Sequence, residues 1–512
     1  MTAETIHQSS NEKWVLVTAV LASGMAFIDA TALNVALPAI QSQTRATGTE
    51  LFWIVNSYAV VTAALILFGG ALGDGFGRKR VFAIGISLFV AASLGCGLSS
   101  GTQFLIVART LQGLGAALMI PGSLALISTT FHASHRGRAI GIWSACSVVM
   151  TALGPIIGGL LADIGWWRAI FFINLPIGVL SLAALLTKVK VPVHQRSRSV
   201  DYAGAVFGIV ALAGINFALL EVASRGWNDV IVVSAFVGGI LFLGVFLWHE
   251  SRSASPLLPL ELCRNQNFRA ACQLTVCFYS GLYGMLFFLA LNLIQVQGYA
   301  AAVAGAAQLP VMVLVILLSP IAGSLVDRYG PRLPLMVGGI LGGLGFLMLA
   351  RPSVTSGSTY YWTSFFPPLL LLGAAMGMSA APLSTTIMNS VPATHSGVAS
   401  GINSMLSRLS SVLGIAILGP IAFITFSHAL MQQSQSLSLD DRWSSALQRE
   451  SWRLADAVPP PGMSPEMTNA VQNGIRLAYV DAFRVVSCIS AALVVLSTLL
   501  AAMMLQKPTV GD

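Results

Sequence analysis

Long apolar runs alternate with short polar segments along almost the whole chain. Fourteen of these runs are long enough to cross a bilayer, which takes about 20 apolar residues in a helix. In lipid, backbone N–H and C=O groups must be paired within the segment itself, and a helix achieves this. The pattern therefore predicts an all-α polytopic membrane protein with 14 transmembrane helices.

Composition agrees with this prediction and excludes several other classes of protein. Only 9% of the 512 residues are charged, against about 25% in soluble proteins, and 55% are apolar. Fourteen spans leave no room for a large domain outside the membrane. The six cysteines lack paired spacing, so we expect neither a disulfide framework nor a metal site. The net charge of +8 comes from Lys and Arg scattered through short loops, which argues against a nucleic-acid partner.

The distribution of basic residues predicts the orientation in the membrane. If the N-terminus is cytoplasmic, the inner loops carry most of the Lys and Arg residues. The outer loops before residue 429 carry only four, namely Arg45, Arg168, Arg225 and Arg351. Basic loops remain on the cytoplasmic side, so we expect both termini there, in a bacterial plasma (inner) membrane. One outer segment, about 427–475, is long and polar, and it is interpreted either as a cap or as a disordered connector.

A short motif occurs twice and reveals an internal repeat. The segments GGALGDGFGRKR (69–80) and AGSLVDRYGPR (322–332) share the order Gly-x-Leu-x-Asp-x-x-Gly. They lie about 250 residues apart, whereas two six-span halves would place them about 190 to 200 apart. The surplus equals one helix pair. We therefore predict an N-terminal six-helix bundle (1–187), an inserted pair (188–252) and a C-terminal six-helix bundle (253–512), a repeat architecture known among transporters.

These motifs resemble those of the major facilitator superfamily, specifically its 14-span drug:proton antiporters. FIDATALNVALPAI (27–40) is similar to that family's span 1 signature. The loop motif matches at Gly70, Leu72, Asp74, Gly77, Arg78 and Lys79, the proton-coupling motif at Arg109, Gln112, Gly113 and Gly115, and the antiporter motif at Gly154, Pro155, Gly158 and Gly159. Departures occur at Gly75, Met150 and Pro331. The resemblance implies the major facilitator fold and a multidrug efflux transporter.

Asp29 is the only acidic residue well inside a span of the N-terminal half. Placing a carboxylate in the membrane costs about 2.5 to 3.5 kcal/mol, which favours a functional role. We expect Asp29 to exchange a proton and to attract a cationic substrate. Arg109 lies at a similar depth and is expected to respond to the charge on Asp29, with Gln112 and Asn34 nearby. The alternative interpretations are a structural carboxylate and a fixed ion pair.

The other motifs point to gating and helix packing. Asp74, Arg78 and Lys79 lie on a tight cytoplasmic loop, where an Asp that accepts from Arg or a helix N-terminus would latch the two halves together. Asp327 and Arg328 offer a weaker second copy. The glycines of the antiporter motif favour close helix contact, and in the resembled family this span distinguishes antiporters from symporters.

Span 9 carries a candidate substrate pocket. Tyr279, Tyr283 and Phe287 recur at spacings of four and therefore share a helix face, with Asn292 further out and Met376 in span 12. Aromatic and methionine surfaces suit promiscuous binding, although packing against the core or lipid explains them too. Glu221 is interpreted as rim decoration. For Arg408 two partners stay open, namely a substrate anion and a backbone carbonyl.

The hypothesis that unites these features is a proton-coupled antiporter that exports amphipathic, cationic drugs or toxic compounds by alternating access. The alternative is a dedicated exporter of one metabolite, lipid or siderophore on the same scaffold. The sequence contains no Gly-x-x-x-x-Gly-Lys-Ser/Thr loop for ATP. We therefore expect a secondary active transporter rather than an enzyme, driven by the proton gradient without a cofactor and working as a monomer.

Overall fold

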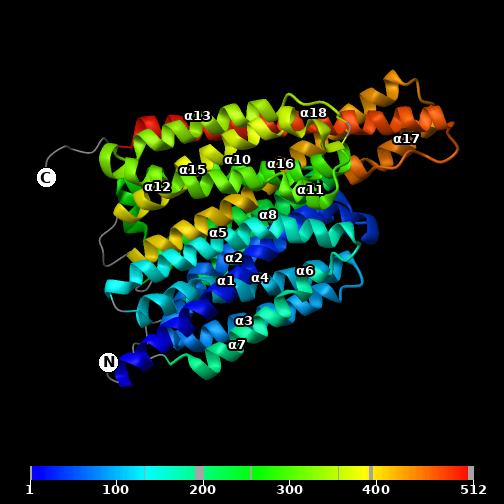
Figure 1. The fold of residues 1–512 in the computed structure, drawn as a ribbon. Coiled ribbons are helices and arrows are strands. Elements are labelled where there is room, and N and C mark those ends of the chain that lie inside the picture. Colours follow the sequence, from blue (N-terminus) through cyan, green and yellow to red (C-terminus); the bar gives the residue numbers. More distant parts are fainter. Residues whose placement is uncertain are drawn as a thin grey trace. The chain divides into compact units, whose positions relative to one another are not determined.

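The computed structural model describes residues 3–131, 133–190, 201–253, 256–355, 357–390 and 396–505. The secondary structure of these residues is entirely helical (Figure 1). Fourteen helical segments are long and apolar enough to cross a membrane. The predicted all-α class and the predicted number of spans are therefore confirmed.

Some spans are built from one helix and others from two successive helices. The elements are α1 (Ala3–Thr44), α2 (Gly48–Phe76), α3 (Arg78–Gly97), α4 (Thr102–Thr130), α5 (Ala133–Asp163), α6 (Ala169–Phe172), α7 (Asn174–Lys188), α8 (Tyr202–Arg225), α9 (Val230–Glu250), η1 (Leu260–Arg264), α10 (Gln266–Leu291), the π-helix η2 (Asn292–Val296), α11 (Ala301–Ala306), α12 (Leu309–Tyr329), α13 (Arg332–Leu349), η3 (Gly357–Tyr360), α14 (Tyr361–Ser364), α15 (Phe366–Asn389), α16 (Ser396–Ser436), α17 (Asp441–Arg449), η5 (Ser451–Asp456) and α18 (Pro465–Met504).

Both copies of the loop motif contain a glycine with positive φ at the junction of two helices. Gly77 separates α2 from α3 with φ of 99°, and Gly330 ends α12 with φ of 76°. Both values lie in the left-handed region, which glycine adopts without steric cost. The repeat seen in the sequence thus has a structural counterpart, since a glycine with positive φ separates two long helices in each copy.

The chain divides into two compact units, each held together by contacts among its own residues. The first comprises residues 1–34, 54–214 and 238–260, and the second comprises 35–53, 215–237 and 261–512. In the first unit α3 packs against α4 and α7. In the second unit α10 packs against α16 and α18, and α15 packs against α12 and α13. The division cuts through α1, α2, α8 and α9, and the bundle boundaries inferred from the sequence stay predictions.

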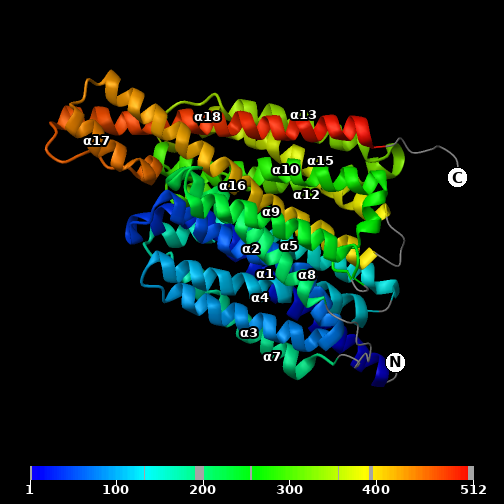
Figure 2. The same ribbon diagram turned by 180° about the vertical axis from the view of Figure 1, so that it is seen from behind.

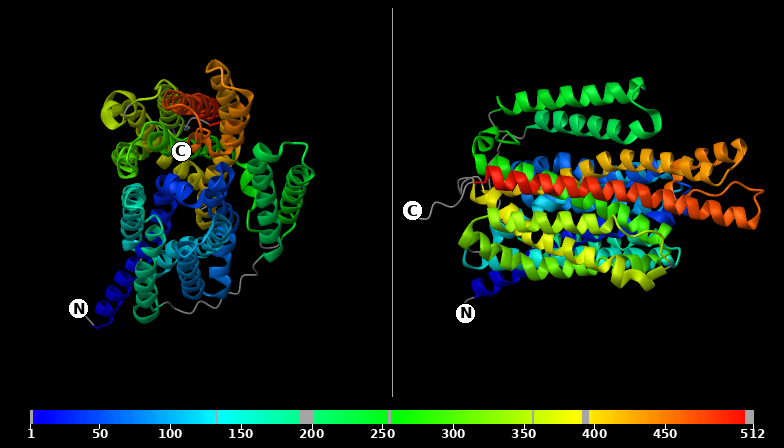
Figure 3. Two further views of the ribbon diagram at one scale, coloured as in Figure 1. Left: turned by 90° about the vertical axis from the view of Figure 1, so that its right-hand side faces the viewer. Right: turned by 90° about the horizontal axis from the view of Figure 1, so that it is seen from above.

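Helices α8 and α9 run side by side (Figure 3), and their interpretation as an inserted pair stays a prediction. Their rings meet at Phe207 and Phe242, whose centroids are 6.3 Å apart. The Tyr202 ring contacts Phe68 of α2 at 5.6 Å. Glu221 is only 15% exposed, and its Oε1 accepts a hydrogen bond from the indole of Trp53 at 2.9 Å. Glu221 therefore ties α8 to α2, and it is more than a rim residue.

Asp201 lies immediately before α8 and anchors the ends of the inserted pair. Its carboxylate accepts hydrogen bonds from the Gly204 N–H and the Ser253 hydroxyl, both at 2.8 Å, and lies 2.8 Å from Nε2 of His249. Burial by itself raises the pKa of Asp201, but the bonds from Gly204, His249 and Ser253 outweigh it. They hold the pKa of this carboxyl below its usual range.

Asp201→Asn is expected to lower the melting temperature at neutral pH and to have less effect in acid. A carboxylate whose pKa falls on folding contributes stability above its unfolded pKa, about 3.9, and loses it as the pH falls through the folded value. The melting temperatures of wild type and variant between about pH 7 and about pH 3 test this. A difference of equal size at both ends of the range would contradict it.

The polar segment at about 427–475 is helical rather than a disordered connector. Helix α16 continues through it to Ser436, α17 and η5 follow, and α18 begins at Pro465 (Figure 2). Leu430 and Ser434 are buried, so the apolar stripe of α16 extends beyond its hydrophobic run. The hydroxyl of Ser464 caps α18 by accepting from the Met467 N–H at 3.2 Å. The role of this segment as a cap stays a prediction.

Candidate functional site

Asp29 lies in α1 at the centre of a buried polar cluster of the first unit. Its side chain has no exposed surface. Oδ1 accepts hydrogen bonds from Nε2 of Gln112 at 2.9 Å and from Nδ2 of Asn174 at 3.2 Å. Oδ2 is ion-paired with Nη1 of Arg109. Both oxygens are thus bound by donors from other helices, with Gln112 and Arg109 supplied by α4 and Asn174 by α7.

Arg109 is held by several protein groups at once, and only 1% of its side chain is exposed. Nη1 also donates to Oε1 of Gln112 at 2.7 Å, and Nε donates to the carbonyl of Ile54 at 3.3 Å. The guanidinium lies 4.4 Å from the centroid of the Tyr58 ring and 5.9 Å from that of Phe171. Aromatic faces attract a cation, so they compensate part of its lost hydration.

Ser93 of α3 ties this cluster to a further helix. Its Oγ accepts hydrogen bonds from Asn174 at 3.0 Å and Gln112 at 3.3 Å, and it donates to the carbonyl of Phe171 at 2.9 Å. Ser93 and Asn174 are both completely buried. The Asp29 cluster, meaning Asp29, Ser93, Arg109, Gln112 and Asn174, therefore connects α1, α3, α4 and α7.

The charges of this cluster are balanced only while Asp29 is ionised. A proton on Asp29 would remove the ion pair and leave Arg109 as a buried cation without a counter-ion. Breaking a buried pair in this way costs about 3 to 5 kcal/mol. The contact between α1 and α4 at this cluster is therefore expected to depend on the charge of Asp29.

The glycines of the antiporter motif bring α5 against α1 beside this cluster. A Cβ on Gly154 would overlap Oγ1 of Thr31 and lie 2.9 Å from the carbonyl oxygen of Ile28. A Cβ on Gly158 would overlap the carbonyl oxygen of Ala32. Pro155 lies inside α5, and Gly159 is buried. The two helices thus touch along the turns of α1 that flank Asp29, which is the close contact that the small residues predict.

The basic residues of the first loop motif bind helix ends within the first unit. Nζ of Lys79 donates to the carbonyl of Val189, just beyond α7, at 2.6 Å. Nη1 of Arg78 is 3.5 Å from the carbonyl of Ala125 near the end of α4. Cations at helix C-termini are stabilised by the helix dipole. Arg328, in the second copy, is exposed.

The latch itself stays a prediction. The side chains of its two acids, Asp74 and Asp327, lie outside the part of the molecule that the structure describes. Gly70 has room for a Cβ, which would meet Pro121 at 3.8 Å. Its neighbour Gly69 does not, because a Cβ there would overlap the carbonyl of Ala117. The close approach of α2 to α4 therefore depends on Gly69 rather than on Gly70.

The predicted substrate pocket is only partly assembled. The rings of Tyr279 and Tyr283 are stacked, with centroids 5.4 Å apart and an interplanar angle of 16°. Phe287 instead packs against Phe52 at 5.5 Å and is 1% exposed. Asn292 is equally buried and accepts a hydrogen bond from Gln297. Of the five residues proposed, the structure joins the two tyrosines, while Phe287 and Asn292 serve packing and Met376 is half-buried.

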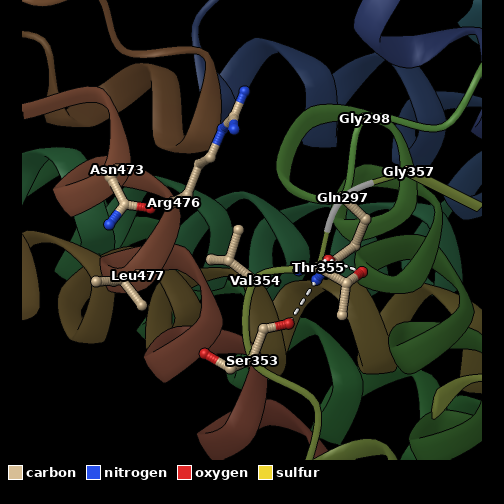
Figure 4. Close-up of a pocket in the computed structure, with 9 residues that line it drawn as sticks. All are labelled: Gln297, Gly298, Ser353, Val354, Thr355, Gly357, Asn473, Arg476 and Leu477. Atoms are coloured by element: carbon tan, nitrogen blue, oxygen red, sulfur yellow. Dashed lines mark hydrogen bonds between the residues drawn. The ribbon is translucent and has the colours of Figure 1, made fainter. Parts of the chain in front are cut away.

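A cavity of about 600 Å³ lies elsewhere in the second unit (Figure 4). The residues that line it belong to the segments after α10, after α13 and at the start of α18; they are Gln297, Gly298, Ser353, Val354, Thr355, Gly357, Asn473, Arg476 and Leu477. Gln297 organises its wall, since its Oε1 accepts from the Thr355 N–H and hydroxyl at 2.6 and 2.7 Å. This lining includes none of the residues predicted to bind substrate.

The sequence profile of the Major Facilitator Superfamily matches residues 19–415. The chain belongs to the major facilitator superfamily. The multidrug resistance protein Stp of Mycobacterium tuberculosis is 37% identical over 398 residues, which cover 78% of this chain and 73% of Stp. The tetracenomycin C resistance and export protein of Streptomyces glaucescens is 33% identical over 459 residues, covering 86% and 82%. A crystal structure of a bacterial homologue of the human lysosomal transporter Spinster aligns with a TM-score of 0.65 at 18% identity, covering 98% and 99%.

Membership of the facilitator superfamily settles the class of the protein. It is a multi-pass membrane transporter with the major facilitator fold and not an enzyme. The resemblance seen in the sequence is confirmed, since the relatives are facilitators named for drug resistance.

Three features of the facilitator's Asp29 cluster differ from the sequence-based expectation. Asn174 and Ser93 belong to the cluster but were not predicted. Asn174 is the kind of isolated amide in an apolar run that could have been recognised as a buried polar residue. A serine within a span is too common to be singled out. Asn34 does not join the cluster. Its Oδ1 is buried and makes no hydrogen bond within the ranges described.

Proposed function

We propose that this facilitator is a proton-coupled antiporter that exports amphipathic drugs or toxic compounds by alternating access. The observation that carries the proposal is the buried Asp29–Arg109 pair, completed by Gln112 and Asn174. Two relatives are named for multidrug resistance and for resistance to and export of tetracenomycin C. Small molecules that cross or enter the bilayer are therefore the substrates to expect.

The proposed cycle starts with the ionised pair. A proton that enters from the outside neutralises Asp29, Arg109 leaves it, and the freed contact between α1 and α4 allows the outward-open state to release substrate. Loss of the proton to the cytoplasm restores the pair. A cationic substrate would compete with Arg109 and with the proton for the ionised carboxylate of Asp29, so substrate and proton would exclude one another. The proton gradient supplies the energy, and no cofactor is needed. In this proposal the transporter works as a monomer with both termini in the cytoplasm.

A dedicated exporter of one metabolite, lipid or siderophore is the second candidate. The tetracenomycin C relative is named for a single compound, which supports it. A broad dye and drug panel separates the two candidates. Transport of several unrelated amphipathic compounds supports multidrug export, whereas transport of one compound supports the dedicated exporter.

Asp29→Asn is expected to reduce proton-driven efflux by at least about tenfold. The amide cannot exchange a proton, so the protonation step that displaces Arg109 is lost. The measurement is dye efflux from proteoliposomes under an imposed pH gradient, with empty vesicles as background. Gradient-dependent transport by wild type and its absence in the variant would support proton coupling through Asp29.

Asp481→Asn is the matched control for this experiment. Asp481 is also an acid paired with an arginine, Arg484 at 2.9 Å, but 45% of its side chain is exposed. This variant should retain wild-type efflux. If dye efflux by Asp29→Asn still depends fully on the pH gradient, the proposed coupling is overturned. The Asp29–Arg109 pair would then be a fixed structural ion pair.

A further inference from the structure

Arg408 is a cation inside the membrane span Gly401–Ser436. It lies seven residues from the inner end of that span, so its depth is about 10 Å at 1.5 Å per residue. Its side chain is partly buried, and its guanidinium makes no hydrogen bond or ion pair with the residues that the structure describes. A charge at such depth is costly and is normally paired, so its counter-ion needs an explanation.

The second unit offers Arg408 almost no acidic partner. Five of the six spans between residues 266 and 504 contain neither Asp nor Glu; they are Gln266–Val296, Ala301–Val326, Arg332–Leu349, Phe366–Asn389 and Gly401–Ser436. The remaining span, Pro465–Met504, has two acids: Glu466 lies in the first turn of α18, and Asp481 is already paired with Arg484. The contrast with Arg109, whose partner is built into the protein, suggests that the anion opposite Arg408 arrives with a ligand.

An aromatic platform lies on α10, which packs against α16. The Ser410 hydroxyl of α16, two residues from Arg408, donates to the carbonyl of Thr275 in α10 at 3.4 Å. Tyr283 is stacked on Tyr279, with ring centroids 5.4 Å apart. Neither phenol hydroxyl is hydrogen-bonded within the described ranges, and Tyr283 is only partly buried. The cation and the stacked tyrosines thus lie on two helices that pack against each other.

Small side chains flank Arg408 on its face of α16. Ser404 and Ser411 lie four residues before and three residues after Arg408, so they share its face of the helix. Both side chains are small and partly exposed. The Ser411 hydroxyl donates to the backbone carbonyl of Arg408 at 2.7 Å, so it does not occupy the guanidinium.

We propose that Arg408 and the stacked pair Tyr279–Tyr283 form a subsite for an aromatic carboxylate. The guanidinium binds the carboxylate through charge-assisted hydrogen bonds, and the tyrosine platform stacks on the ring. The subsite deepens the proposed export function by adding a class of substrate that the Asp29 cluster does not attract. It also resolves the alternative left open for Arg408, in favour of a substrate anion.

Binding of two dyes to the purified full-length protein in nanodiscs tests the proposal. Fluorescein carries a free carboxylate, and rhodamine 123 presents a similar ring system as a cation. We expect wild type to bind fluorescein, measured by fluorescence polarisation, and 1-naphthoate to displace it while its neutral isostere 1-naphthamide does not. Arg408→Gln should weaken fluorescein binding about tenfold, which is the range of one charge-assisted bond, and should leave rhodamine 123 binding unchanged.

Two further variants make this test decisive. Arg408→Lys keeps the charge and should retain preferential displacement by 1-naphthoate, even if Arg408→Gln does not fold. Arg225→Gln removes a cation that is 45% exposed and should bind both dyes as wild type does. Fluorescein binding that is absent in wild type, or unchanged in a folded Arg408→Gln protein, would overturn the subsite.

The outcome is separable from the test of the proposed function. Arg408-dependent binding of fluorescein without any gradient-driven efflux would support the subsite and count against the proposed antiport. The converse result would be gradient-driven efflux that requires Asp29 and fluorescein binding that is unchanged in Arg408→Gln. It would support the antiport and overturn the subsite.

Discussion

Arg109→Met is expected to lower the free energy of unfolding by about 3 to 5 kcal/mol, which is the typical cost of leaving one member of a buried ion pair alone. Asp29 would keep its hydrogen bonds from Gln112 and Asn174 but would lose its ion pair with Arg109. Methionine fills much of the same volume, so the loss reflects charge rather than a large cavity. Unfolding of the purified protein by titration with SDS in mixed micelles measures this difference.

The double variant Asp29→Asn/Arg109→Met separates charge from packing. Removing both charges leaves neither one buried without a partner, so the double variant should recover most of the stability that Arg109→Met loses. Arg484→Met is the surface control, because Arg484 and Asp481 are each more than 40% exposed and such pairs contribute about 0 to 1 kcal/mol. Equal destabilisation by Arg109→Met and Arg484→Met would show that the buried pair has no special energetic weight.

Gly158→Ala is expected to destabilise the protein by about 1 to 3 kcal/mol, and Gly158→Leu is expected to prevent folding. The added Cβ would overlap the carbonyl oxygen of Ala32, a backbone atom that cannot rotate away as a side chain can. Helix α5 would have to move from α1 within one turn of Asp29. We therefore expect Gly158→Ala to reduce both stability, measured by SDS unfolding, and gradient-driven efflux.

Gly323→Ala is the matched control for the glycine prediction. Gly323 lies in helix α12 of the second loop motif, and a Cβ built there meets no heavy atom within 4 Å. Alanine at such a site favours the helix by up to about 1 kcal/mol, so stability should be unchanged or higher. If both substitutions were tolerated equally, the close contact between α5 and α1 would not be what selects glycine at position 158.

Features that depend on local pattern were predictable. The number of spans follows from apolar run length, because the membrane imposes one length on every crossing helix. The two motif copies were recognisable too, and in each a glycine with positive φ, Gly77 or Gly330, separates two long helices. The inserted pair inferred from their spacing stays a prediction. Ends of helices were less predictable. Helix α16 runs on to Ser436 and α18 starts at Pro465, because residues beyond the apolar run still bury one face.

The sequence by itself determined the membrane class, the repeated motif and the family resemblance. It also singled out Asp29 and Arg109, since a charge in lipid is costly wherever the neighbouring helices lie. Only the tertiary structure decided which groups meet those charges. Asn174 and Ser93 are distant from Asp29 in the chain, and helix packing alone brings them into the cluster. Packing likewise stacks Tyr283 on Tyr279 but places Phe287 against Phe52, because residues on one helix face can meet different neighbours.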